Sequence, residues 1–374
     1  MRVIALAALM VALAAGAAHA YPQLLFTTGA TRCGECHVEP SGGGLLTEYG
    51  RDEAGDTLSG RGDGRLLHGA WTPPDWLALG GDLRGALGGK QLDGQDAELL
   101  AFPMQADLTA RAAIGPVALT ITAGANGAVR GRNDGAPLTS YLVSRAHFAS
   151  LHPDGAAWSV RAGRFFPTLG IRTQDHTAYV RRHLDMYLLE EPYAIEGQLA
   201  RGAWQGFAAA FLGNPVPETG AGDHASGGTL YVERLLGATG AAAGQVRVAR
   251  SDESHRYLLG AVGRRWFDGP ALLLTGELDV QRQRFTATGF VRYQLVGYLA
   301  VTRPFLPGYL IGATVQRYAP DVSFRGTSRN AVELNLQAFP WAHAELHLLT
   351  RAEAPGGRTL HPDLLALLQL HYYL

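Results

Sequence analysis

The sequence predicts an all-β fold whose strands close into an antiparallel barrel. Segments such as 117–123 and 331–338 alternate apolar and polar side chains with a period of two, which is typical of β-strands. Tight turns and long polar connections alternate along the chain, as they do in outer-membrane barrels. After residue 20 there is no uncharged apolar run of the about 18 residues that a transmembrane helix needs.

Residues 1–20 are expected to be a secretory signal peptide. A single Arg precedes a run of Ala, Leu and Val, and Ala18-His19-Ala20 fits the small-residue cleavage rule. We therefore expect a mature chain that begins near Tyr21 and folds in an oxidising compartment outside the cytoplasm. A core helix of the mature fold is the alternative.

The two cysteines of the chain belong to one motif, Cys33-Gly34-Glu35-Cys36-His37. This is the attachment pattern of haem c, in which two thiols bind one haem and the following His is the axial ligand of its iron. A thiol–disulfide oxidoreductase would need a βαβ context, and a structural zinc site would need further ligands. The motif therefore predicts one covalent haem c, with Cys33 and Cys36 as attachment sites and His37 as a ligand of the iron.

Residues 21–75 are predicted to form a small N-terminal haem c segment. The segment has few large apolar residues and is shorter than most independent domains, so we expect it to borrow the walls of a haem pocket from the rest of the chain. It contains no Met, and its only His besides His37 is His68, which is the candidate distal ligand. The alternatives are an open site and residues of a later loop, namely His176, His183 and Met186.

Residues 76–374 are predicted to form the barrel, with about sixteen strands counted from the alternation pattern. The strands are expected near 78–88, 100–112, 116–126, 140–151, 157–166, 192–201, 203–212, 227–236, 241–250, 256–267, 270–281, 288–301, 307–318, 330–339, 342–352 and 364–374. Tight turns follow the even-numbered strands. An even strand count places both ends of the barrel on the tight-turn side, which faces the periplasm in outer-membrane barrels. A periplasmic β-domain is the alternative.

The connection 167–191 follows the fifth predicted strand and is rich in Arg, His and Asp. Its position is similar to that of the porin loop that folds into the lumen, and an ordinary surface loop is the alternative. Carboxylates and histidines in the outer loops are candidate ligands for a hard cation. These candidates are Asp175, His176, Asp223, His224, Asp252, Glu253 and His255, and ordinary solvated loop residues are the favoured alternative.

A signal peptide, one Cys-x-x-Cys-His motif and a porin-like barrel, in this order, resemble the fused monohaem cytochrome–porins of the bacterial outer membrane. The best-known members of that family oxidise extracellular ferrous iron. The residues that carry the resemblance are Tyr21-Pro22, Cys33–His37, Pro40 and Gly50-Arg51. The resemblance covers the whole mature chain in architecture and residues 21–51 in motif.

The resemblance implies electron transfer through a haem at the mouth of the barrel. Its partners would be outer-membrane lipid, a periplasmic electron carrier, and extracellular Fe(II) or another external redox partner. The alternatives are a diffusion porin with a haem-containing sensing or plug segment, and a soluble periplasmic cytochrome with a β-rich domain. A net charge of −1 offers no electrostatic footprint for nucleic acid. The sequence has no catalytic triad, nucleotide loop or HExxH motif, so no catalytic residue is predicted.

Overall fold

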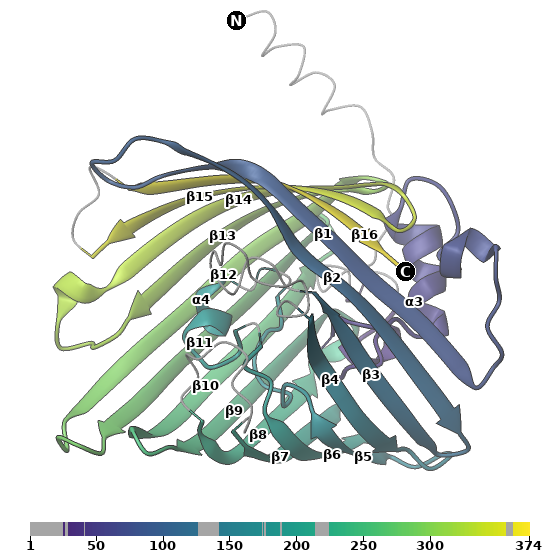
Figure 1. The fold of residues 1–374 in the computed structure, drawn as a ribbon, viewed down its shortest axis with the longest axis horizontal. Helices are drawn as coiled ribbons and strands as arrows, with labels where there is room; N and C mark the ends of the chain where they lie inside the picture. The colour runs from purple at the N-terminus through teal and green to yellow at the C-terminus, as the bar shows by residue number, and fades with distance from the viewer. Residues whose placement is uncertain are drawn as a thin grey trace, which may run out of the picture.

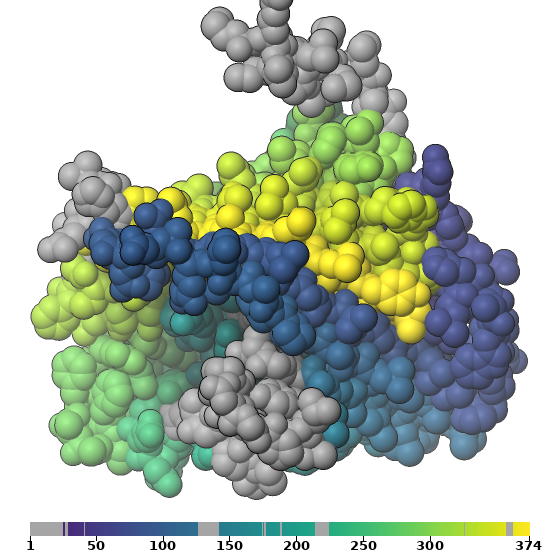
Figure 2. Space-filling model, turned by 45° about the horizontal axis from the view of Figure 1, so that its top comes forward, coloured from purple at the N-terminus to yellow at the C-terminus, as the bar shows by residue number. Residues whose placement is uncertain are grey.

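The computed structural model describes residues 25–26, 29–40, 42–125, 142–173, 175, 177–187, 189–213, 224–356 and 362–374. Sixteen antiparallel strands close into one barrel, because β1 (Leu77–Gln91) pairs with β16 (Asp363–Tyr373). These two strands run side by side across the tilted wall in Figure 2. The predicted all-β barrel is confirmed, while the predicted signal peptide and the start near Tyr21 lie outside the described residues.

The remaining strands are β2 (Glu98–Ile114), β3 (Val117–Ala125), β4 (Leu142–Leu151), β5 (Trp158–Arg164), β6 (Tyr193–Arg201), β7 (Trp204–Leu212), β8 (Ser226–Leu235), β9 (Gly240–Arg250), β10 (Ser254–Phe267), β11 (Leu272–Phe285), β12 (Val291–Leu306), β13 (Tyr309–Ala319), β14 (Arg329–Trp341) and β15 (Ala344–Pro355). The helical elements are α2 (Cys33–Cys36), α3 (Glu48–Glu53), η2 (Ala54–Leu58), η3 (Leu66–Gly69), α4 (Tyr179–Arg182), η5 (Gly237–Thr239) and η6 (Arg325–Thr327). No helix among the described residues is both long enough and apolar enough to cross a membrane.

The connections after even-numbered strands are short, as predicted, and most of those after odd-numbered strands are longer. The connections 251–253 and 286–290 follow odd-numbered strands and are short as well. The gaps that the predicted strands leave before 307–318 and before 342–352 are wrong in position. Residues 304–306 belong to β12 and residues 340–341 belong to β14, because cross-strand pairing continues to Leu306↔Tyr309 and Trp341↔Ala344. The turns themselves lie at residues 307–308 and 342–343.

The barrel is apolar outside and polar inside. Leu278, Val315 and Leu334 are each about half exposed or more on the outer surface, at 53%, 49% and 60%. Their neighbours in sequence point inward, where Asp279 and Gln316 are buried. This is the reverse of a soluble protein, and it is the arrangement expected of a barrel that faces lipid. We therefore describe the chain as spanning the bacterial outer membrane.

The N-terminal segment, which comprises the described residues between 25 and 76, docks at the short-turn end of the barrel. The backbone N–H of Gly60 donates to the carbonyl of Phe339 (2.8 Å), and that of Ala342 donates to the carbonyl of Arg61 (2.7 Å). On another part of the rim, Arg32 donates to the carbonyl of Gly202 (2.6 Å). Figure 1 shows α3 beside the C-terminus at this end. The segment thus contacts separate turns of the same barrel mouth.

The connection between β5 and β6, residues 165–192, folds into the lumen, and we call it the inward loop. The backbone N–H of Gly170 donates to Gln245 on β9 (2.5 Å), and that of Ile171 donates to Glu277 on β11 (2.6 Å). At the start of α4, the N–H of Tyr179 donates to Gln316 on β13 (2.6 Å). The predicted inward course of this loop is confirmed.

Candidate functional site

The Cys-x-x-Cys-His motif forms one helical turn, α2. The backbone N–H of His37 donates to the carbonyl of Cys33 (3.0 Å), and that of Thr47 donates to the carbonyl of Cys36 (3.0 Å). A Cβ at Gly50 would overlap the carbonyl of Cys36, so α3 can pack this closely on α2 only because residue 50 is glycine. Local packing therefore fixes the direction in which the motif presents its side chains.

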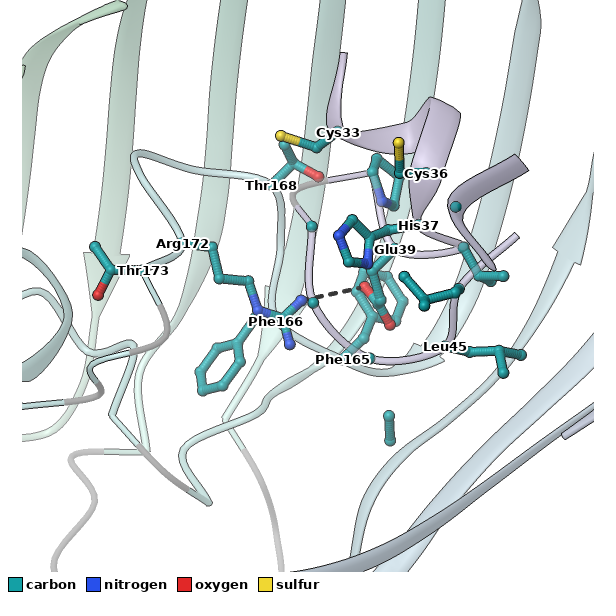
Figure 3. A pocket seen from close by; sticks show the side chains of 18 of the residues that line it. Cys33, Cys36, His37, Glu39, Leu45, Phe165, Phe166, Thr168, Arg172 and Thr173 are labelled. Atoms are coloured by element: carbon teal, nitrogen blue, oxygen red, sulfur yellow. Dashed lines mark ion pairs between the residues drawn. The ribbon is translucent and has the colours of Figure 1, made fainter. Parts of the chain in front are cut away.

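The motif side chains line a cavity of about 280 Å³ inside the short-turn end of the barrel, which we call the lumen cavity. The N-terminal segment forms one wall, the barrel strands form others, and the inward loop contributes a third part (Figure 3). The loop residues that line the cavity are Phe165, Phe166, Thr168, Gly170, Ile171, Arg172, Thr173, Arg181 and Glu191. Apolar side chains from the segment and the barrel, Leu25, Ala30, Val38, Leu45, Leu58, Phe207 and Val262, line part of it. Barrel residues therefore form cavity walls that the N-terminal segment does not form alone, as the composition of the segment predicted.

Cys33 and Cys36 are free thiols that pack against the barrel wall. Both contact an apolar cluster that includes Trp266 and Leu273. Burial raises the pKa of the Cys36 thiol to about 12. The Nη1 atom of Arg264 lies 3.6 Å from the Sγ atom of Cys33. The two thiols are therefore held on one turn of helix, each partly buried against this apolar cluster.

His37 presents an imidazole without its full set of hydrogen bonds. Its Nδ1 atom is buried and has no hydrogen-bond partner among the described residues. Burial, followed by the nearby charge of Arg172, lowers the pKa of His37 to about 4, so the ring is neutral near pH 7. A neutral imidazole is the form that ligates a metal.

Glu39 links the N-terminal segment to the barrel and the inward loop. Its carboxylate accepts a hydrogen bond from Arg161 of β5 (2.5 Å) and forms an ion pair with Arg172 (3.6 Å), drawn as a dashed line in Figure 3. Arg161 also binds Glu196 of β6 (2.9 Å) and lies 4.0 Å from the centre of the Phe165 ring. We call Glu39, Arg161, Arg172 and Glu196 the Glu39 cluster. Glu39, Arg161 and Glu196 are buried, which makes their pairing necessary, and Arg172 is partly exposed.

The residues at the lumen cavity fit a covalently attached haem. Two thiols three positions apart, the following neutral imidazole with an unused nitrogen, and apolar walls are the groups that haem c requires. Gly42 leaves room beside them, since a Cβ there would lie 3.6 Å from the Cβ of Cys33 and 3.9 Å from the Cδ2 of His37. Cys33, Cys36 and His37 are the residues that would hold the group.

His68 does not line the lumen cavity. It is exposed in η3, and its ring lies 4.7 Å from that of His343 at the β14–β15 turn. The Nε2 of His343 lies 2.9 Å from the carbonyl oxygen of Arg65, which holds η3 at that turn. His68 was the predicted distal ligand. Its position in the structure gives no geometric support to that prediction.

The other ligand candidates from the sequence are also placed elsewhere or not described. His183 stacks on Tyr318 at 3.7 Å, and Met186 is buried in an apolar cluster with Leu184. Asp175 is paired with Arg351 (2.5 Å), and His176 lies outside the described residues. Within the described part of the chain, no three His, Cys, Asp or Glu side chains gather where they could hold a metal ion.

The Glu39 cluster is the part of the site that the sequence did not reveal. Glu39 stands two residues after His37, but nothing in the sequence pairs it with Arg161, which is 122 positions away. The alternation in β5 indicates only that Arg161 faces inward. The pairing depends on how the N-terminal segment docks, and sequence periodicity carries no information about that docking.

The fold defines a porin-like outer-membrane β-barrel. No family model and no curated protein sequence matches the chain. Among solved structures, it is similar to OmpT of Vibrio cholerae (TM-score 0.60, 12% identity, covering 81% of this chain and 99% of that one). It is also similar to OprB of Pseudomonas putida (TM-score 0.60, 11% identity, 80% and 94%) and to an anion-selective porin from Comamonas acidovorans (TM-score 0.57, 11% identity, 80% and 99%). At these identities the likeness concerns the fold alone.

Proposed function

We propose that this protein carries one covalent haem c at the mouth of its barrel and transfers electrons across the outer membrane. The observation that carries the proposal is that Cys33, Cys36 and His37 line one cavity enclosed by the barrel and the inward loop. When bound, haem c supplies one-electron redox chemistry. The alternative uses of the Cys pair have less support. A thiol–disulfide oxidoreductase would need a βαβ setting, whereas the motif here lies at the mouth of an antiparallel barrel. Among the described residues no three His, Cys, Asp or Glu side chains gather to form a metal site.

The chain's own residues have three tasks in this proposal. Cys33 and Cys36 fix the group, and His37 supplies a neutral nitrogen to the iron. The apolar part of the lining would shield the group at the end of a lumen that is otherwise polar. The Glu39 cluster holds the N-terminal segment against the barrel. A segment that left the barrel would expose the edge of the haem.

The geometry of the mouth favours electron transfer over free diffusion. The N-terminal segment contacts the β6–β7 turn through Arg32 and the β14–β15 turn through Gly60 and Arg61. The inward loop occupies the lumen behind it, with Gly170 and Ile171 fixed to the far wall. A solute would have to pass both, whereas an electron needs only a redox group within reach of a donor and an acceptor.

The test is a redox titration of the purified protein in detergent, followed by the addition of Fe(II). We expect a haem c absorption spectrum and its reduction by Fe(II), which is the donor that the family resemblance suggests. Sealed vesicles containing the protein should then reduce an enclosed acceptor when Fe(II) is added outside. A protein without covalent haem would overturn the proposal, and a haem that Fe(II) does not reduce would overturn only the choice of donor.

The second candidate is a diffusion porin whose N-terminal segment is a plug or sensor. The similarity to OprB and to the anion-selective porin favours this function. The discriminating measurement is conductance in a planar bilayer. Steady open-channel currents of general-porin size from the intact protein would favour the porin, and currents that appear only after the N-terminal segment is displaced would favour the electron-transfer protein. The closed barrel with an apolar exterior does not support a soluble periplasmic cytochrome.

A further inference from the structure

One bulge in the barrel wall turns a methionine into the lumen cavity. In β2, Gln105 pairs with Arg84 of β1, and Pro103 pairs with Gly85, so Met104 between them has no partner. An extra residue of this kind is a β-bulge, and bulges re-aim side chains near functional sites. Pro103 fits beside the bulge, because proline has no backbone N–H and a bulge interrupts the hydrogen bonds between the strands.

The bulge changes which face of the sheet Met104 occupies. Asp107 is buried inside the barrel, and Leu108 is exposed to the lipid side. Strict alternation from Asp107 would place Gln105 inward and Met104 outward. Instead, Met104 and Gln105 both line the lumen cavity, and Pro103 is exposed. A soft thioether is thus brought into the space that His37 faces, at a point where regular strand geometry would have sent it into the lipid.

The other nitrogen and sulfur groups that line this cavity are already engaged. Cys33 and Cys36 are the attachment thiols of the proposed function. The two ring nitrogens of His371 lie 2.9 Å from Glu345 and 2.8 Å from Asp82, so both are occupied by carboxylates. Met104 is the only Met, and His37 and His371 are the only His, among the described residues that line the cavity.

We propose that Met104 is the second axial ligand of the haem iron, opposite His37. This inference rests on the proposed function, since it needs the haem to be present. Methionine is one of the two common second ligands of haem c, and it raises the reduction potential relative to histidine. A barrel strand would then supply a ligand to a group that is attached to the N-terminal segment. The iron itself would join the segment to the wall, so loss of the ligand would also loosen the docking.

The test compares Met104→Leu with Met186→Leu, a matched control in which the other Met of the described residues is removed from an apolar cluster outside the lumen cavity. Covalent haem is first measured by peroxidase staining of a denaturing gel. The ferric spectrum is then recorded in the visible and near-infrared regions. We expect Met104→Leu to keep its haem, lose the sulfur-to-iron charge-transfer band and turn high spin. Met186→Leu should keep the wild-type spectrum.

A second variant keeps the proposal testable if Met104→Leu folds poorly. Met104→His should give a low-spin spectrum without the charge-transfer band, and a lower midpoint potential in a redox titration. An unchanged spectrum and potential in the Met104 variants would overturn the ligand assignment and leave the proposed function standing. A wild-type protein that shows no haem stain would overturn the proposed function and the ligand assignment together.

Discussion

Cys33 and Cys36 project from the same turn of α2 into the lumen cavity, so each is expected to form one bond to the haem. Cys33→Ala or Cys36→Ala should lose or greatly weaken the haem band on a denaturing gel, because a single thioether retains the group poorly. The double variant should show no band. The barrel should still fold in these variants, which heat-modifiable gel mobility would check. A fully stained double variant would remove the basis of the haem assignment.

Glu39 compensates the buried guanidinium of Arg161 and the partly exposed guanidinium of Arg172. Glu39→Gln should therefore destabilise the docked N-terminal segment by about 3–5 kcal/mol, the range found when one partner of a buried ion pair is removed. The measurement is urea-dependent proteolysis of the segment in the purified protein. Glu48→Gln, at an exposed position of α3, is the control and should behave as wild type. Equal protease resistance of the two variants would contradict this role for Glu39.

At the residue scale, the sequence predicted the parts of the site that lie close together in the chain. Cys33, Cys36 and His37 stand within five positions, and one helical turn brings them together. The contacts that depend on docking could not be predicted, and His68 shows why. As the only other His of a segment without Met, it was the candidate distal ligand, but hydrogen bonding to the β14–β15 turn fixes its helix at the rim.

The inward loop carries a glycine where it meets the far wall of the barrel. Gly170 has a φ of +60°, and a Cβ there would overlap the carboxylate of Glu277. Gly170→Ala should push this part of the loop away from β11 and raise the single-channel conductance that is measured after the N-terminal segment is displaced. Gly155→Ala is the matched control, because its φ of +69° imposes a similar backbone cost in open space. Identical conductance of the two variants would show that this part of the loop does not limit the lumen.

A buried carboxyl near the other end of the same loop gives it a pH dependence. Burial raises the pKa of Glu190 to about 7 from its ordinary value of 4.5, and the carboxylate accepts a hydrogen bond from the N–H of Tyr187 (2.9 Å). A raised carboxyl pKa means that the folded loop prefers the protonated form. Its contribution to stability is complete below pH 4.5 and is lost as the pH rises through about 7.

Protease resistance of the inward loop should therefore fall between pH 5 and pH 8 in the wild type. Glu190→Gln should flatten this dependence, because the amide does not ionise. Glu253→Gln, in an exposed connection, should keep the wild-type profile. A steep fall that persists in Glu190→Gln would assign the dependence to another group.

At the scale of elements, alternation predicted the strands and their faces well, because lipid on one side and a polar lumen on the other impose a period of two. Val117, Leu119 and Ile121 are exposed on the outer surface as the pattern indicated. Alternation failed at Met104, where a bulge shifts the period. The Pro103 beside it was the available signal, since proline inside a strand often marks a bulge.

Orientation is a property of the whole molecule. Outer-membrane barrels place short turns in the periplasm, so the N-terminal segment should face the periplasm. Ala287→Cys lies in the connection between β11 and β12, and Gly269→Cys lies in the short turn between β10 and β11. A membrane-impermeant maleimide should label the first variant on intact cells and the second only after the outer membrane is permeabilised. The reverse pattern would invert the orientation.

The enclosure of the two thiols has a consequence for the order of biogenesis. Cys33 and Cys36 pack against a cluster that holds Trp266 and Leu273, in a barrel that closes only when β1 meets β16. If the proposed haem is attached, the docked N-terminal segment would restrict the access of an attaching enzyme to both thiols. Attachment would then be favoured before the segment docks and the last strand pairs. A barrel that closed without haem would acquire it only slowly afterwards.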